Sequence, residues 1–322
     1  MSGLNGNNPP NPLNGPKRVL VVGANSYIGG SFARYAGGRL CIDIVDSYEG
    51  WKAATFHKYD SVLMVAGLAH LKWNRKQQEA NKDRYFAVNC DLAVAVAEKA
   101  RAGGAGQFIY LSSMAVYGLA EGEITADTIA LPRARDYYGQ SKHRAEMALT
   151  SLFGAGTAKT EDAQSVVPVD CSSVDTASLC IVRPPMVYGP GCPGKFATLV
   201  KIAKKLPLIP NINNRRSMIY ADNLSEFLCL AVEKNISGVF APHNKEYMNT
   251  TWLLKAARKA IGKRTWVVPG FSLVVRCLKP FVTALKTAFG SLYYDEEMCM
   301  LPSGDNYQPV SAEESILRSL KG

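Results

Sequence analysis

The stretch KRVLVVGANSYIGGSFARYA, residues 17–36, decides the fold of this 322-residue chain. A short apolar run rich in valine leads into a turn that contains glycine, and a pattern typical of an amphipathic helix follows. Gly23, Ser26 and Gly29 occupy the three positions of a GxxGxxG turn, with serine in the middle. Gly23 lets the chain turn tightly, and Gly29 lets helix and strand approach closely. Because N–H groups at a helix start bind phosphate, the turn predicts a dinucleotide site.

Strand and helix patterns alternate along the first half of the chain. Strand-like runs occur at 40–45, 61–66, 107–111 and 178–182, and helical patterns occur at 74–102 and 138–152. This alternation predicts βαβ units and a parallel sheet covered on both faces, which is a doubly wound α/β domain. Folds of this kind bind ligands at the carboxyl ends of their strands.

The chain divides into three predicted regions. Residues 1–16 form a disordered tail, residues 17–183 form the dinucleotide-binding domain, and residues 184–322 form a smaller α/β substrate-binding region. Elements of the last region are expected to interleave with the first domain. Residues 153–177 are polar, small and aperiodic, and they predict a long surface loop.

Positive charge is concentrated in the second half of the chain. The chain has 37 Lys and Arg against 27 Asp and Glu, a net charge of +10, of which +8 lies in residues 184–322. Between Glu246 and Asp295 there is no acid but eight bases. Three interpretations are open: a solvated helix face, attraction of a diphosphate substrate, and a peripheral contact of residues 255–290 with anionic lipid. Without a recognised nucleic-acid motif, a nucleic-acid partner is not expected.

Cysteine usage and the N-terminus predict a cytoplasmic enzyme. Eight cysteines are scattered without a CxxC pair or a histidine cluster, so neither a metal site nor a dense disulfide framework is expected. The N-terminal residues lack the apolar core of a signal peptide, and no apolar run is long enough for a spanning helix.

An acidic residue about 20 positions after the glycine turn holds the adenosine ribose in an NAD site. Asp46, at the end of CIDIVD, is the candidate, and its carboxylate would repel the extra phosphate of NADP. We therefore predict NAD as the cofactor, with NADP as the open alternative. The first helical residues after the turn, Tyr27 and Ile28, belong to the same predicted site.

Three residues form a candidate catalytic group. Tyr138 and Lys142 lie four residues apart in YGQSK, so they share a helix face. An ammonium beside a phenol favours the phenolate, which would lower the phenol pKa and make Tyr138 a general base on an alcohol. Ser113, at the carboxyl end of the strand in FIYLSSMAVYG, can hydrogen-bond the same substrate oxygen.

With these motifs in place, the sequence resembles the extended short-chain dehydrogenase/reductases, in particular the NAD-dependent nucleotide-sugar epimerases and dehydratases. The resemblance runs from about Lys17 to the C-terminal helix. It is carried by VVGANSYIGG, VAGLAH, YFAVNCDLAV, FIYLSSMAVYG, YGQSK, RPPMVYGPG and RRSMIYADNL. It implies a Rossmann fold, a nucleotide-sugar substrate, and a homodimer made by the helices at 76–102 and 138–152.

The resemblance also implies residue roles. Ala66, Gly67 and Asn89 would line the cofactor, Pro184 would lie near the nicotinamide, and Lys142 would also hold the nicotinamide ribose. Arg216 matches an arginine that contacts the nucleotide diphosphate, and Met114 and Met186 would face the substrate. One departure matters: only 31 positions separate Gly29 from Asp60, which is short for the family's second and third strands. Asp46 can therefore correspond to the acid of either strand.

The residues after Ser113 bear on the reaction. Related dehydratases carry acids at this point, but here Met114 and Ala115 cannot transfer protons, so 4,6-dehydration is disfavoured. We favour an NAD-dependent 4-epimerase acting on a UDP-hexose or UDP-N-acetylhexosamine, as in surface-polysaccharide sugar synthesis. The alternatives are an NAD(P)H-dependent 4-keto-sugar reductase and a non-catalytic NAD sensor. His70 is a further candidate for substrate contact.

Overall fold

The structure, a computed structural model, describes residues 15–69, 73–154, 177–205, 207–278 and 288–321. Most of the predicted tail, most of the loop expected at 153–177, and His70 lie outside these residues.

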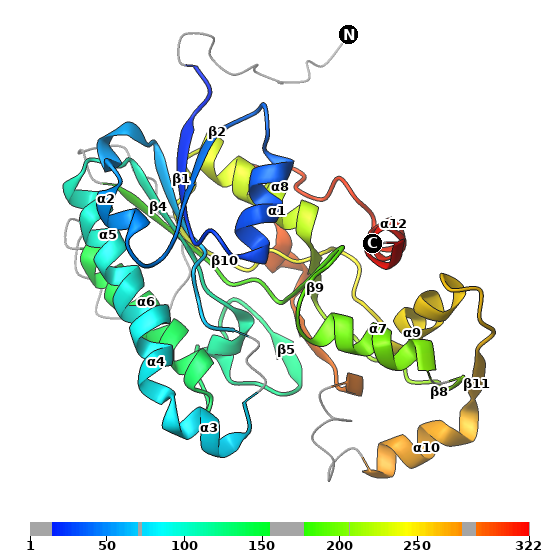
Figure 1. The fold of residues 1–322 in the computed structure, drawn as a ribbon. Coiled ribbons are helices and arrows are strands. Elements are labelled where there is room, and N and C mark those ends of the chain that lie inside the picture. Colours follow the sequence, from blue (N-terminus) through cyan, green and yellow to red (C-terminus); the bar gives the residue numbers. More distant parts are fainter. Residues whose placement is uncertain (1–14, 70–72, 155–176, 206, 279–287, 322) are drawn as a thin grey trace, which may run out of the picture.

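A six-stranded parallel sheet forms the centre of the molecule, with the strand order β10-β6-β4-β3-β1-β2 (Figure 1). Its strands are β1 (Arg18–Val22), β2 (Cys41–Val45), β3 (Ser61–Met64), β4 (Gln107–Leu111), β6 (Ser178–Val182) and β10 (Gly238–Phe240). The expected doubly wound α/β fold is confirmed. Strands β1, β3 and β4 are buried along almost their whole length, as expected when helices cover both faces.

Two helical layers cover the sheet, each over its own apolar cluster. One layer contains α1 (Tyr27–Tyr35) and α8 (Ala221–Glu233), and the other contains α5 (Leu92–Ala102) and α6 (Tyr137–Gly154). The helix expected over 74–102 is interrupted. It is divided into α3 (Arg75–Ala80), α4 (Lys82–Phe86), a π-helical turn (Ala87–Asp91) and α5, with Asn81 between the first two. A short helix, α2 (Gly50–Ala53), follows β2.

The sheet has one strand fewer beyond β1 than the usual order of this fold, in which two strands precede the first. Every residue between 15 and 69 is described, and β2 is the only strand on that side. This explains the short spacing between Gly29 and Asp60. It also settles the position of Asp46, which ends the strand directly beside β1.

Outside the central sheet, the described residues form three short parallel pairs, to which the C-terminal part contributes every strand but β5, and further helices. They are β5 (Gly122–Ile124) with β12 (Leu292–Tyr294), β7 (Met186–Tyr188) with β9 (Met218–Tyr220), β8 (Leu208–Pro210) with β11 (Trp266–Val268), and the helices α7 (Lys195–Lys205), α9 (Thr250–Lys259), α10 (Pro269–Leu278) and α12 (Ala312–Lys321). Strand β10 comes from this part of the sequence but pairs with β6 of the central sheet. No helix in the described ranges is long and apolar enough to cross a membrane.

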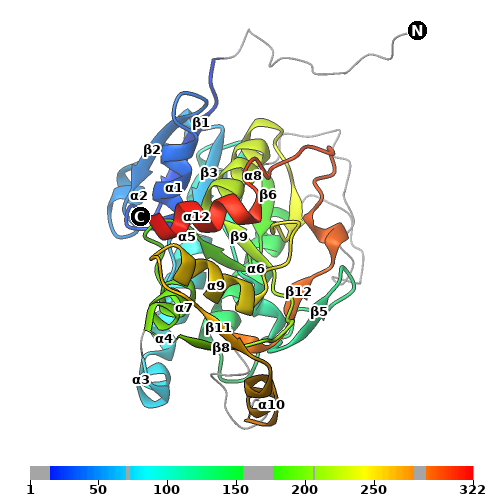
Figure 2. The ribbon, with the colours of Figure 1, turned by 90° about the vertical axis from the view of Figure 1, so that its right-hand side faces the viewer.

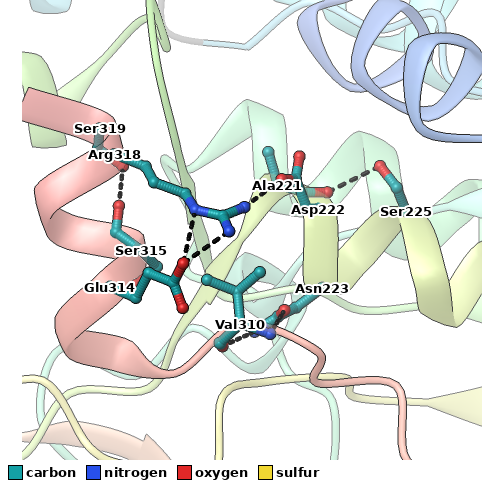
Figure 3. A network of polar contacts seen from close by, with 9 residues as sticks. All are labelled: Ala221, Asp222, Asn223, Ser225, Val310, Glu314, Ser315, Arg318 and Ser319. Atoms are coloured by element: carbon teal, nitrogen blue, oxygen red, sulfur yellow. Dashed lines mark hydrogen bonds and ion pairs between the residues drawn. The ribbon is translucent and has the colours of Figure 1, made fainter. Parts of the chain in front are cut away.

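The C-terminal helix α12 is anchored on α8 by polar contacts (Figure 3). The Asn223 side chain donates to the Val310 carbonyl oxygen at 2.9 Å and accepts from its N–H at 3.2 Å. Arg318 pairs with Glu314 at 2.6 Å and lies 3.7 Å from Asp222. The bonds to Asn223 are buried, so they contribute more to the attachment than the half-exposed ion pairs.

Candidate active site

The glycine turn brings the ends of β1 and β3 into close contact. Gly23 has a φ of +131°, and a Cβ there would lie 2.8 Å from the backbone nitrogen of Ala66. A Cβ on Gly29 would lie 3.0 Å from Val65 Cγ2 and 3.2 Å from Val21 Cγ1. Only glycine fits the first position, and the second allows α1 to lie directly on the sheet.

The serine in the middle of the turn begins α1. Ser26 is its N-cap residue, and its hydroxyl accepts a hydrogen bond from the N–H of Gly29 at 3.2 Å. Ile28 packs against the core, and the phenol of Tyr27 reaches Gly189 in the loop after β7. The N–H groups of Tyr27 and Ile28 come before the first backbone bond of the helix, which Gly30 donates to Ser26. A helix end of this kind is suited to a pyrophosphate.

A cavity of about 560 Å³ opens between the start of α1 and the loop at 190–193. It is lined by Ala24, Asn25, Ser26, Tyr27, Gly30, Arg34, Pro190, Gly191 and Pro193. It includes the glycine turn but not the candidate catalytic residues. Arg34, which the sequence analysis missed, places a cation beside this phosphate-binding end.

Asp46 lies next to the turn because the N–H groups of Gly23 and Ala24 both donate to the carbonyl oxygen of Val45. Its Oδ1 accepts hydrogen bonds from the N–H groups of Tyr48, Glu49 and Gly50, at 2.7 to 3.4 Å. These bonds lower the pKa of Asp46, so it is ionised at neutral pH. The carboxylate is therefore a fixed negative charge at the end of β2.

Ser113 and Tyr138 meet although 25 residues separate them. A Cβ on Gly139 would lie 2.8 Å from the Ala115 carbonyl oxygen, so glycine at 139 allows α6 to approach the 3-10 turn Met114–Tyr117. The Ser113 side chain lies beside the Tyr138 phenol and lowers the phenol pKa. Burial outweighs this effect, and the net pKa of Tyr138 is raised.

Lys142 is buried and donates from Nζ to the Leu111 carbonyl oxygen at 2.7 Å. Its Nζ also lies 4.7 Å from the centre of the Tyr110 ring. Burial lowers the Lys142 pKa from 10.5 to about 7. Among the described side chains, Ser113 lowers the Tyr138 pKa, and the Lys142 ammonium is bound to the Leu111 carbonyl oxygen. The lowering of the Tyr138 pKa by Lys142 beside an oxidised cofactor stays a prediction.

Two predicted cofactor residues surround the Lys142 ammonium. A Cβ on Gly67 would lie 3.1 Å from Asn89 Oδ1 and 3.2 Å from Lys142 Nζ. Asn89 lies in the π-helical turn, where its side chain accepts from the N–H of Leu68 at 2.7 Å and donates to the Ser141 hydroxyl at 2.9 Å. The π-helical turn thus orients a polar side chain toward the ends of β3 and β4.

Pro184 and the substrate candidates lie on the other side of Ser113. The Pro184 carbonyl oxygen accepts from the N–H of Met114 at 3.0 Å, which brings the end of β6 to the 3-10 turn. Met186 begins β7 and is paired with Met218 of β9, the strand that follows Arg216. Structure and sequence therefore agree that these residues lie near one another.

A buried ion pair beneath the site was missed by the sequence analysis. Glu146 follows Lys142 by one helical turn and forms two hydrogen bonds with Arg183, at 2.6 and 3.0 Å. Ser112 also donates to Glu146, and Arg183 donates to the Tyr117 hydroxyl at 2.9 Å. The negative charge of Glu146 raises the pKa of Lys142 against the effect of burial. The i, i+4 spacing between Lys142 and Glu146 is the sequence signal that could have identified Glu146.

Arg216 has a second cation beside it. Arg216 lowers the pKa of Lys195, the first residue of α7, and burial lowers the pKa of both side chains. Arg216 donates to the Gly290 carbonyl oxygen at 3.0 Å, and Asp136, two residues before Tyr138, raises the Lys195 pKa. The half-buried Arg216 and the exposed Lys195, near the start of α6, form a candidate site for a diphosphate. Lys195 was missed because nothing in its local sequence distinguishes it from a surface lysine.

The described residues fit a dinucleotide along the carboxyl ends of β2, β1, β3, β4 and β6. The fit rests on two positions that a Cβ would fill, Gly23 and Gly67, on the free end of α1, and on the ionised Asp46. At the far end of this row lie Ser113, Tyr138 and Lys142, which can exchange a proton with an alcohol.

Comparison with known proteins gives a consistent result. The model of the NAD dependent epimerase/dehydratase family matches residues 19–241. The UDP-glucose 4-epimerase of Vibrio cholerae is 30% identical over 231 residues, which are 68% of this chain but only 62% of that enzyme. The N-acetyl-alpha-D-glucosaminyl-diphospho-ditrans,octacis-undecaprenol 4-epimerase of Escherichia coli O157:H7 is 24% identical over 64% of this chain and 56% of that protein. The solved UDP-glucuronic acid 4-epimerase of Bacillus cereus, in complex with NAD, shares the fold with a TM-score of 0.65 at 16% identity, covering 94% of this chain and 97% of that chain.

Proposed function

Because the chain belongs to the NAD-dependent epimerase/dehydratase family, we propose that it is a nucleotide-sugar 4-epimerase that works through a 4-keto intermediate. The observation that supports this proposal is the proximity of Ser113 to Tyr138, which the close approach of α6 at Gly139 allows, with Lys142 one turn further along α6. Met114 and Ala115 follow Ser113 and supply no acid for dehydration.

Each residue has a defined part in this reaction. NAD, when bound, supplies the acceptor for the hydride from C4 of the sugar. Tyr138 takes the O4 proton and later returns it, while the Ser113 hydroxyl donates a hydrogen bond to O4 as negative charge develops there. Lys142 would hold the nicotinamide ribose, Asn89 would line the cofactor, Pro184 would lie near the nicotinamide, and Asp46 would bind the adenosine ribose hydroxyls. In this mechanism the 4-keto sugar rotates within the site, so that C4 would receive the hydride back on its opposite face.

The substrate is a UDP-hexose or UDP-N-acetylhexosamine in this proposal. Arg216 and Lys195 together supply two positive charges for its diphosphate, which carries two negative charges. The E. coli relative's name gives a sugar joined by diphosphate to undecaprenol. Since the two cations recognise a diphosphate rather than a nucleoside, a polyprenyl-diphosphate-linked N-acetylhexosamine is the second substrate to test. Either would belong to surface-polysaccharide synthesis.

A 4-keto-sugar reductase is the second candidate function, and one observation favours it. Burial raises the Tyr138 pKa, so the phenol is protonated at neutral pH and ready to donate a proton. In that reaction NAD(P)H is consumed and the sugar is not returned to its starting oxidation state.

Product analysis separates these functions. Full-length protein is incubated with UDP-glucose or UDP-N-acetylglucosamine and NAD, without reduced cofactor, and the products are followed by NMR. The epimerase forms the C4 epimer. Turnover of a 4-keto sugar with NAD(P)H, without epimerisation, would identify a reductase, and NAD binding without either reaction would identify a sensor.

Tyr138→Phe tests the mechanism. It removes the hydroxyl that exchanges the proton but keeps the ring, so turnover is expected to fall by at least about 100-fold, while NAD remains bound. Tyr137→Phe, at the neighbouring position on α6, is the control. Undiminished turnover in Tyr138→Phe would disprove the role given to this residue.

A homodimer through α5 and α6 completes the proposal. The long helix α6 carries the exposed Met147 on its outer surface, as a helix in a subunit contact does. Sedimentation of the protein at equilibrium tests it.

A further inference from the structure

One part of the molecule contains no acidic residue. We use the name basic lobe for residues 195–210 and 250–278, which form α7, β8, α9, β11 and α10. These residues include ten Lys and Arg but no Asp or Glu. The rest of the chain has 27 of each sign, so the whole net charge of +10 belongs to the basic lobe.

The basic lobe is a packed unit with its charges on the outside. Helix α7 packs on α9, β8 pairs with β11, and α10 packs on β8. Arg258 faces inward and donates to the carbonyl oxygens of Ala203 at 3.1 Å and Arg264 at 2.6 Å. The other described basic side chains of the lobe are exposed: Lys195, Lys201, Lys204, Lys205, Lys255, Lys259, Lys263 and Arg264.

Large apolar side chains are exposed among these charges. Leu273 of α10 is 67% exposed and Trp266 of β11 is 58% exposed. Val268 of β11, Leu278 of α10 and Leu208, which is paired with Trp266 from β8, are exposed as well. Figures 1 and 2 both place α10 at the end of the molecule opposite to the labelled β1 and β2, away from the central sheet.

We infer that the basic lobe is a docking surface for an anionic membrane. Lysines and arginines are attracted to acidic headgroups, and aliphatic and tryptophan side chains enter the boundary between headgroups and acyl chains. A nucleic acid would use the charges but not the exposed leucines. A basic or neutral protein surface would not use the charges.

Docking would bring the candidate site close to the membrane surface. Helix α7 starts at Lys195, beside Arg216, and ends at Lys205, so the two ends are about 15 Å apart at 1.5 Å per residue. The lobe therefore connects the pair of cations proposed for the diphosphate to the surface that would contact lipid. The inference does not depend on the reaction that the site catalyses.

Vesicle co-sedimentation tests it with full-length protein. The wild type should pellet with vesicles of phosphatidylcholine and phosphatidylglycerol in equal parts at low salt, and stay in the supernatant with phosphatidylcholine alone. K259E/K263E/R264E should abolish pelleting, whereas K58E/K76E/K82E, which changes the net charge equally on exposed lysines of the other part, should retain it. Leu273→Ser should weaken binding, and Leu131→Ser, at an exposed leucine outside the lobe, should not.

A fluorescent probe tests the orientation without a charge change. Cys277 of α10 and Cys41 of β2 are both exposed. An environment-sensitive probe on Cys277, with Cys41 and Cys171 replaced by serine, should gain intensity on the anionic vesicles, and a probe on Cys41 in the reciprocal variant should not. Wild type that stays in the supernatant at low salt, equal effects of the two triple variants, or equal responses of the two probes would overturn the inference. So would binding of duplex RNA or DNA without binding to the vesicles.

Discussion

The buried ammonium of Lys142 links the candidate site to the stability of the protein. Its pKa falls from 10.5 to about 7, so between these values the unfolded chain binds a proton that the folded chain does not. In this window the free energy of unfolding therefore rises with pH, by up to about 1.4 kcal/mol per pH unit for one proton. Below about pH 7 both states are protonated, and the cost of burying the charge is fully present.

Lys142→Met should remove this pH dependence. The wild type, free of dinucleotide, gains stability from about pH 7 to about pH 9 relative to the variant, as measured by urea unfolding across that range. Lys82→Met, at an exposed lysine of α4, is the control and should follow the wild type. Parallel stability curves for wild type and Lys142→Met would show that the ammonium is not buried as described.

Asp46 should determine the choice between NAD and NADP. Three N–H groups keep its carboxylate ionised, and asparagine can accept the same hydrogen bonds without the charge. Asp46→Asn should therefore reduce the ratio of the NADP and NAD dissociation constants by about tenfold. The reason is that one charge a few ångströms from a phosphate contributes at least about 1 kcal/mol. Asp43→Asn, on the same strand but bonded to Arg18 and Tyr59, should leave the ratio of the two dissociation constants unchanged.

Helix α1 offers a matched pair of substitutions at the scale of an element. A methyl group on Gly29 meets Val65 and Val21, whereas on Gly30 it meets nothing within 4 Å. Gly29→Ala should therefore destabilise the protein, by about 1 to 3 kcal/mol. Gly30→Ala should stabilise it by about 0.5 to 1 kcal/mol, because alanine favours the helix. Chemical unfolding without dinucleotide measures both, and changes of the same sign would contradict the packing of α1 on β1.

Most elements of the sheet could be predicted from the sequence because their signals are local. The strands at 107–111 and 178–182 agree with β4 and β6, and the helix at 138–152 lies within α6. The break at Asn81 and the π-helical turn that contains Asn89 were both missed, because the residues around them suit a helix. Local sequence patterns do not indicate such an interruption of a helix.

Contacts between segments far apart in the sequence are the second kind of feature that could not be predicted. Ser113, Tyr138 and Lys142 could be found because each ends a strand or begins a helix with a recognisable spacing. The proximity of Lys195 to Arg216 depends on the pairing of β7 with β9, which joins short strands without a distinctive pattern. The Glu146–Arg183 pair likewise connects α6 to the end of β6, and charge alone did not reveal it.

At the scale of the whole molecule, charge is separated between the two parts of the chain. The net positive charge of the chain lies in the basic lobe, which begins at Lys195 beside the proposed diphosphate site. Such a field attracts a dianionic substrate and increases the rate of encounter, an effect that salt screens over about 10 Å at ~0.1 M. Turnover of the bound substrate does not depend on this attraction.

Ionic strength should therefore change only the rate at which the enzyme and its substrate meet. For the nucleotide-sugar substrate, kcat/KM should decrease as ionic strength rises, while kcat stays nearly constant. K259E/K263E/R264E should flatten this dependence more than K58E/K76E/K82E, because its charges lie in the lobe that adjoins the proposed diphosphate site. Equal flattening would mean that only the net charge of the molecule matters, and a parallel loss of kcat would place the lobe's charges in the reaction itself.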